Sequence, residues 1–99
     1  MRKKIVAGNW KMNMTSEEGR KLVKSIIIDV KERFYSGLPD NYNVVIAPPF
    51  TFLEECATMV ANIKGMYAAA QNCHSAENGA YTGEISAKMI KAAGASYVI

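Results

Sequence analysis

Residues 5–13 read IVAGNWKMN, an apolar run that ends in small, polar and cationic residues. Such a run is typical of a strand within a parallel sheet, because both faces of that strand are covered and the alternation of apolar and polar residues disappears. Gly8 would let another backbone or a ligand come close to the end of the strand. The sequence therefore predicts a buried parallel strand here.

Asn9 and Lys11 would follow the carboxyl end of this strand, which is where parallel α/β sheets bind ligands. If the chain stays extended, the two side chains lie on the same side of it. An amide beside an ammonium group suits an anionic, oxygen-rich small molecule. Taken alone, however, the two residues fit a solvated lysine beside a turn-forming asparagine better.

The rest of the chain alternates helical and strand patterns. Thr15 with Glu18, and Thr51 with Glu54, have the spacing of a capping box and would each open a helix, while Ser86 can cap a third. Three further strands are predicted, at residues 43–47, 66–71 and 95–99. This order, with short loops, predicts a parallel sheet with right-handed crossovers.

Each predicted helix has one apolar face that would pack on the sheet. Gly19 is expected to weaken the first helix by on the order of 1 kcal/mol relative to alanine. The side chains expected to face inward are Leu22, Val23, Ile26, Ile27, Val30 and Phe34 in the first helix, Leu53, Cys56, Ala57, Val60 and Ile63 in the second, and Met89, Ile90 and Ala93 in the third.

Length and composition limit the possible classes of protein. The 99 residues, 49% of them hydrophobic, suffice for one small domain. The net charge of +3 comes without basic clusters interleaved with aromatics, which gives no case for nucleic-acid binding. The first apolar run is too short for a signal peptide or a membrane span, so a cytoplasmic protein is the default expectation. Cys56 and Cys73 form no Cys-x-x-Cys motif, which favours reduced thiols over a disulfide or a metal site.

Four motifs, in this order, resemble the triose-phosphate isomerase family: VAGNWKMN at 6–13, VVIAPP at 44–49, AQNC at 70–73 and GAYTGE at 79–84. The family's fold is a parallel β/α barrel of eight strands, which typically takes about 250 residues. The resemblance implies an α/β fold in which residues 1–99 are the N-terminal half-barrel segment of one barrel domain. That segment would end within the fourth strand, as in a truncated or split barrel.

The implied activity is the interconversion of dihydroxyacetone phosphate and glyceraldehyde 3-phosphate through an enediolate, without a metal or an organic cofactor. This reaction needs a carboxylate base, an electrophile at the carbonyl oxygen and a cation near the developing charge. The resemblance assigns the catalytic cation to Lys11 and a substrate hydrogen bond to Asn9. The glutamate base and neutral histidine electrophile are known properties of the family, not inferences from this sequence. Their motifs would follow Ile99, so the chain alone is expected to be inactive.

The resemblance also implies a homodimer. The loop at residues 72–84 would reach a neighbouring subunit, where Thr82 would support the partner's Asn9, and Glu84 matches a position that pairs with an arginine beyond Ile99. His74, the only imidazole, does not match the family's catalytic histidine motif and is expected to be exposed or at an interface. The implied dimer-interface residues are Met12, Asn13, Asn72, Thr82 and Glu84.

Two other readings remain. The chain could be a non-catalytic fragment or a split half-barrel that retains anion-binding and dimer-contact residues. A small flavodoxin-like binding module lacks support, because no glycine-rich phosphate motif follows the first strand. An open sheet of four strands would expose apolar edges on the first and fourth strands, so the isolated chain is expected to self-associate or to be only partly ordered.

Overall fold

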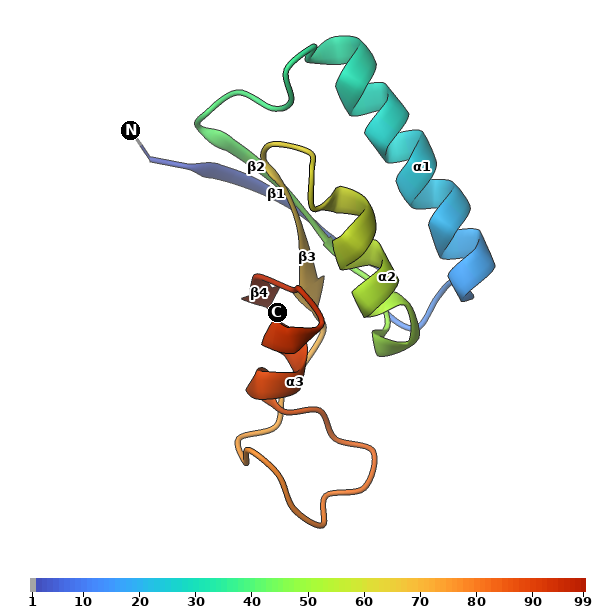
Figure 1. The fold of residues 1–99 in the computed structure, drawn as a ribbon, viewed down its shortest axis with the longest axis vertical. Helices are drawn as coiled ribbons and strands as arrows, with labels where there is room; N and C mark the ends of the chain where they lie inside the picture. Colours follow the sequence, from blue (N-terminus) through green and yellow to red (C-terminus); the bar gives the residue numbers. More distant parts are fainter. Residues whose placement is uncertain (1) are drawn as a thin grey trace.

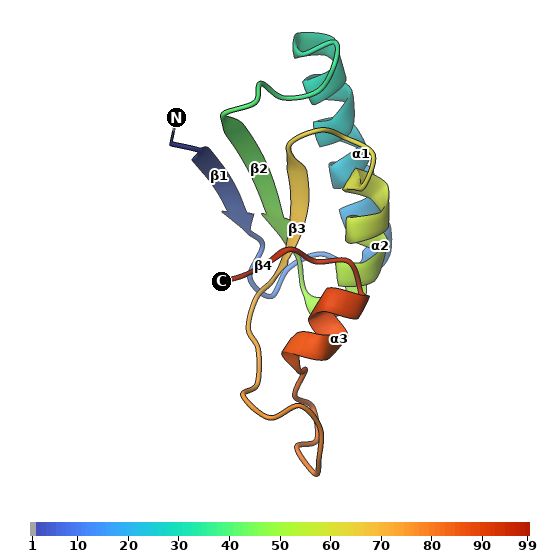
Figure 2. The ribbon, with the colours of Figure 1, turned by 60° about the vertical axis from the view of Figure 1, so that its left-hand side comes forward.

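Four parallel strands lie side by side in chain order, β1-β2-β3-β4, in the computed structural model, which describes residues 2–99. The strands are β1 (Lys4–Asn9), β2 (Tyr42–Ala47), β3 (Met66–Ala70) and β4 (Tyr97–Val98), and the helices are α1 (Ser16–Arg33), α2 (Phe50–Val60) and α3 (Ala87–Ala92). The helices lie on one side of the sheet (Figures 1 and 2). This alternation of parallel strands and one-sided helices forms an open half-barrel, as expected from the sequence.

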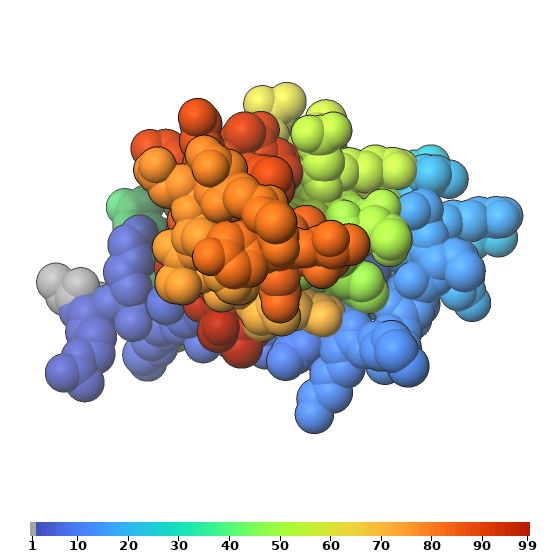
Figure 3. Space-filling view, turned by 90° about the horizontal axis from the view of Figure 1, so that it is seen from below, coloured from blue at the N-terminus to red at the C-terminus, as the bar shows by residue number. Residues whose placement is uncertain are grey.

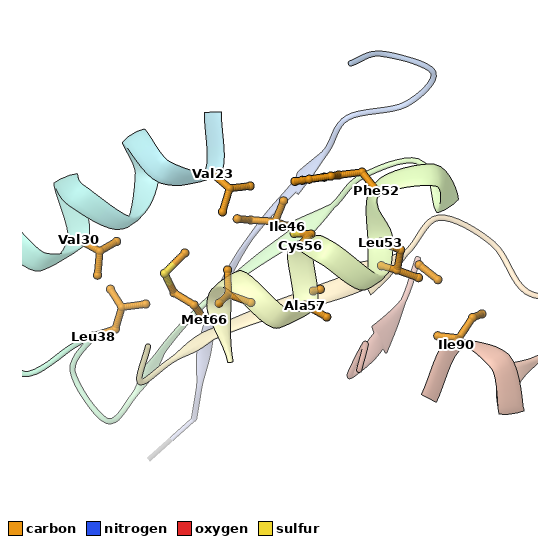
Figure 4. Packing of buried hydrophobic residues seen from close by; sticks show 13 residues of the cluster. Val23, Val30, Leu38, Ile46, Phe52, Leu53, Cys56, Ala57, Met66 and Ile90 are labelled. Atoms are coloured by element: carbon orange, nitrogen blue, oxygen red, sulfur yellow. The ribbon is translucent and has the colours of Figure 1, made fainter. Parts of the chain in front are cut away.

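The main core lies between the sheet and helices α1 and α2 (Figure 4). Its buried members are Val23, Val30, Leu38, Ile46, Phe52, Leu53, Cys56, Ala57, Val60, Met66, Ala68, Ala70 and Ile90. A smaller cluster of Val45, Ala47 and Ala69 lies apart from it, with Tyr67 and Tyr97 packed against it. Asn43 is buried and donates from Nδ2 to the Tyr97 hydroxyl over 3.1 Å, so its polar side chain is satisfied.

The predicted capping box of α1 is confirmed. The Thr15 hydroxyl accepts the Glu18 N–H at 3.3 Å, and the Glu18 carboxylate accepts the Thr15 N–H at 2.9 Å. The hydrogen bond from the Thr15 backbone is the main reason why the pKa of Glu18 lies below its ordinary value. Further along α1, Arg20 forms a two-pronged ion pair with Glu55 of α2, and this contact likewise lowers the pKa of Glu55.

The predicted capping box of α2 is wrong. This helix begins at Phe50, so Thr51 lies inside its first turn and its N-cap is Pro49, with no side-chain cap bond. Proline is tolerated near the start of a helix because the first N–H groups have no partner within the helix. In α3 the predicted Ser86 cap is confirmed, since its hydroxyl accepts the Met89 N–H at 3.2 Å.

Two predictions about inward-facing side chains are also wrong. Met89 is 54% exposed, because α3 has only six residues and buries Ile90 alone. Phe34 is the C-cap of α1, outside the helix, and is 36% exposed. Ile63 lies beyond the end of α2, but it packs against the main core as predicted. Phe52, which the sequence analysis did not select, is among the largest fully buried side chains.

Strand β1 is exposed, contrary to the prediction of a strand covered on both faces. All six of its residues are exposed, and Val6 retains 64% of its accessible surface. The reason is position: β1 pairs only with β2 and forms one edge of the sheet. At the other edge Val98 and Ile99 are also exposed, so the two apolar edges predicted from the sequence are present. In residues 2–99 no helix is long and apolar enough to cross a membrane.

We expect Thr15→Ala to lower the free energy of unfolding by about 1 kcal/mol, because the α1 N-cap loses its acceptor. Urea denaturation at pH 7 would measure this loss. The folded-state pKa of Glu18 is lowered, so its contribution is present at neutral pH and is lost as pH falls through that pKa. Thr15→Ala keeps the backbone N–H that is the main cause of this shift, so most of the difference between the variant and the parent chain should persist in acid.

The matched control is Ser25→Ala, an exposed hydroxyl in the middle of α1. It should change the free energy of unfolding by no more than about 0.5 kcal/mol. Equal losses in the two variants would contradict a specific capping role for Thr15.

Candidate functional site

A shallow groove of about 520 Å³ lies at the carboxyl ends of β1, β2 and β3. It is lined by Asn9, Lys11, Met12, Pro49, Phe50, Gln71 and Asn72. The structure thus brings together Asn9 and Lys11, the two residues that the sequence selected as ligand-binding candidates. Asn72 and Met12, which were expected at a dimer interface, line the same groove.

The backbone turns at Lys11 and does not stay extended as the sequence analysis supposed. Lys11 has a φ of +56°, in the left-handed region that L residues with side chains rarely adopt. Its N–H donates to Oδ1 of Asn9 over 2.8 Å, and its carbonyl accepts Nε2 of Gln71 at 2.9 Å. Both polar groups of Lys11's backbone are therefore held by side chains. Backbone strain that the surroundings enforce in this way is concentrated at functional sites.

Gln71 is a site residue that the sequence analysis missed. Its Nε2 donates to the carbonyl oxygens of Lys11 and Ala47, each over 2.9 Å. One side chain thus connects the segment after β1, the last residue of β2 and the position just after β3. Gln71 could have been found from its position in the sequence. A polar residue directly after an apolar parallel strand lies at the same edge of the sheet as Asn9.

The segment after β1 is anchored through Trp10. The indole stacks on Phe52, with ring centroids 5.9 Å apart and planes 14° from parallel. Its carbonyl accepts Nδ2 of Asn13 at 2.7 Å, and its N–H donates to Ala47 over 3.0 Å. Trp10 is therefore a packing anchor next to the groove.

Gly19 of α1 faces this stack, and the expectation of a simple weak point in the helix is incomplete. A Cβ at Gly19 would lie 2.9 Å from the Phe52 ring and 3.0 Å from the Trp10 ring. Because Phe52 is fully buried, its ring has little room to move. The glycine therefore permits the close approach of α1 to the anchor of the site.

Lys11 is the only ionisable residue in the groove lining, which otherwise offers three side-chain amides from Asn9, Gln71 and Asn72. An ammonium with amide donors and no opposing carboxylate suits an anionic ligand. Among the described residues, no group of three or more His, Cys, Asp or Glu side chains could hold a metal ion. Both cysteines are free, as expected; burial raises the pKa of the Cys56 thiol to about 12, whereas Cys73 is exposed.

Thr82 and Glu84 lie apart from the groove, in the loop at residues 72–84. Figure 1 shows this loop projecting beyond α3, and Figure 3 looks at the molecule from its tip. Glu84 and His74 line a separate hollow of about 240 Å³. His74 and Lys11 therefore line different hollows. Nothing in the described residues places Thr82 or Glu84 against a partner.

An open parallel half-barrel with a cationic groove at the carboxyl ends of its strands defines a protein of the β/α-barrel class, in which ligands bind at that face. A sequence model described as "Triosephosphate isomerase" matches residues 4–99, and the chain belongs to the triosephosphate isomerase family.

Curated relatives agree with this assignment. All of this chain aligns with the triosephosphate isomerase of Flavobacterium psychrophilum at 50% identity and with that of Porphyromonas gingivalis at 46%. The triosephosphate isomerase of Prosthecochloris aestuarii is 44% identical over the same extent. In each case the chain spans 37% of the relative's length.

We expect Gln71→Met to lower the free energy of unfolding by about 0.5–1.5 kcal/mol, because the carbonyls of Ala47 and Lys11 each lose one hydrogen-bond donor, although Ala47 keeps the Trp10 N–H. Denaturation followed through Trp10, the only tryptophan, would measure this and would also report a change around the site.

Lys31→Met provides a matched control, because it places the same side chain on the exposed face of α1. If Gln71→Met is no less stable than Lys31→Met and leaves the Trp10 emission unchanged, Gln71 does not hold the three strand ends together.

Proposed function

We propose that this chain is the N-terminal half-barrel segment, residues 1–99, of a cytoplasmic enzyme that interconverts dihydroxyacetone phosphate and glyceraldehyde 3-phosphate without a metal or an organic cofactor. Membership of the triosephosphate isomerase family supports the reaction. The single structural observation that carries it is Lys11, a lone cation held in a left-handed conformation at the carboxyl ends of the strands.

In this proposal Lys11 is a catalytic residue. The reaction moves a proton between adjacent carbons and builds negative charge on the enediolate oxygens, next to a dianionic phosphate. An ammonium that reaches into the groove from a fixed backbone would stabilise that charge. The hydrogen bonds from Asn9 and Gln71 fix its backbone, and so fix the point from which its side chain reaches into the groove.

Asn9 would bind the substrate through its amide N–H groups. Its Oδ1 accepts the Lys11 N–H at 2.8 Å, and this bond orients the amide so that Nδ2 is its remaining polar atom. The same bond couples the two proposed site residues, because moving either one disturbs the other. Proton transfer itself needs the glutamate and histidine known for the family, which are in motifs expected after Ile99.

The proposed enzyme is a homodimer that uses the loop at 72–84 and the segment after β1. Met12 of the segment after β1 is 94% exposed and Tyr81 of the loop is 52% exposed, so both apolar side chains are accessible to a partner. The proposed interface residues are Met12, Asn13, Asn72, Thr82 and Glu84. The second candidate is a non-catalytic or split half-barrel that retains the anion-binding and dimer-contact residues.

Lys11→Ala tests the assignment in a full-length isomerase that carries this sequence as its N-terminal part. Loss of a charge-assisted contact of about 1.5–3 kcal/mol should lower kcat/KM about ten- to a hundredfold. Steady-state kinetics would measure this, with Lys31→Ala on α1 as the control that keeps normal activity. A folded Lys11→Ala enzyme with normal kcat/KM would remove Lys11 from the site.

The 99-residue chain alone should not isomerise triose phosphates, because it supplies the proposed cation without the base and the electrophile. Absence of a general acid or base typically costs 10²- to 10⁴-fold in rate. A coupled assay on mass-verified protein would test this. Turnover that disappears with Lys11→Ala would show instead that the chain contains a complete site.

A further inference from the structure

We propose that His74 is a pH-sensitive clasp that holds the loop at residues 72–84 in its folded shape. Nδ1 of the imidazole accepts the N–H of Ala76 at 3.0 Å. The ring lies against Tyr81, with centroids 4.4 Å apart and planes at 34°. The His74 N–H donates to the carbonyl of Ile85 over 2.8 Å, next to the isolated bridge between His74 and Ser86. One residue thus closes the base of the loop with its backbone and shapes the interior with its side chain.

The clasp exists only with a neutral imidazole. Nδ1 can accept the Ala76 N–H only while that nitrogen is unprotonated, so the proton of the neutral ring is on Nε2. In the imidazolium both nitrogens are donors, and a donor would face the N–H of Ala76. Histidine side chains generally change charge between about pH 5 and 8. The clasp is therefore closed at higher pH and opens as the ring takes up a proton.

Charged residues share the hollow with His74. Two of the lining residues, Glu77 and Glu84, carry carboxylates. Helix α3 and its N-cap contribute Ser86 and Met89 to the lining of the hollow, and neither side chain is charged. Tyr81 and Cys73 are the remaining titratable neighbours; the Cys73 thiol donates to the His74 carbonyl over 3.3 Å. These titratable neighbours of His74 all belong to its own loop.

The consequence for assembly rests on the function proposed above. The same loop carries Thr82 and Glu84 of the proposed dimer surface, and the exposed Tyr81 whose ring contacts His74. A loop that loses its shape must be ordered again when it meets a partner, and that ordering weakens association. Acid would then shift the enzyme toward separate subunits.

Amide hydrogen exchange at pH 8 and pH 5.5 tests the clasp directly. The protection factor of the Ala76 amide should fall about three- to tenfold at the lower pH, the range of one ordinary hydrogen bond. The nuclear Overhauser contact between His74 and Tyr81 should weaken in parallel, while Trp10 emission shows that the fold persists. An Ala76 protection factor that is the same at both pH values would overturn the clasp.

Two variants separate His74 from the nearby carboxylates. His74→Asn keeps an acceptor near the position of Nδ1 but does not titrate, so Ala76 should stay protected at both pH values. His74→Ala should leave it unprotected at both. A pH dependence in His74→Asn as large as in the parent chain would assign the effect to Glu77 or Glu84 and reject the proposal.

Sedimentation of the full-length enzyme at the same two pH values tests the consequence for assembly. The dimer dissociation constant should rise about three- to tenfold in acid for the parent sequence and remain constant for His74→Asn. A constant value in both would overturn the regulatory role. Failure of the proposed isomerase function would show separately, as normal turnover in the Lys11→Ala enzyme.

Discussion

The candidate site depends on one side-chain amide, that of Gln71. Parallel strands are joined by backbone hydrogen bonds along their length, and between β1 and β2 the last of these runs from the Trp10 N–H to the Ala47 carbonyl. Beyond that point Gln71 joins the carbonyls of Lys11 and Ala47, so three strand ends share a single donor group. This contact holds the left-handed turn at Lys11 against the sheet. It is one of the hydrogen bonds that stabilise the strained backbone conformation there.

Packing against the helices also fixes the segment after β1. The stack of Trp10 on Phe52 ties it to the first turns of α2, and Gly19 lets α1 approach both rings. The Arg20–Glu55 ion pair lies one residue from Gly19 and holds the two helices together. An exposed ion pair adds little stability by itself. Its position next to Gly19 nevertheless supports the close approach of α1 to the Trp10 and Phe52 rings.

The fold could be predicted from the sequence because strand and helix periods alternate clearly and Thr15 with Glu18 marks a helix start. The prediction from Thr51 and Glu54 failed because their spacing is that of a capping box, whereas α2 has Pro49 as its N-cap, two residues earlier. The exposure of β1 was not predictable from an apolar run, which looks alike at an edge and in the centre of a sheet. Asn9 and Lys11 were found from their place after a strand, whereas the role of Gln71 depends on contacts 24 and 60 residues away in sequence.

The arrangement suggests how a barrel active site divides between its two halves. Everything that shapes the Lys11 turn comes from residues 9–71, so this part of the site can form from the first three strand ends alone. Placement of a charge needs only local hydrogen bonds, whereas proton transfer needs groups aligned across the substrate. In the proposed enzyme the N-terminal half would therefore bring a preorganised cation, and closure of the barrel would add the acid–base chemistry. The strain at Lys11 would belong to folding of the first half, before any substrate or second half is present.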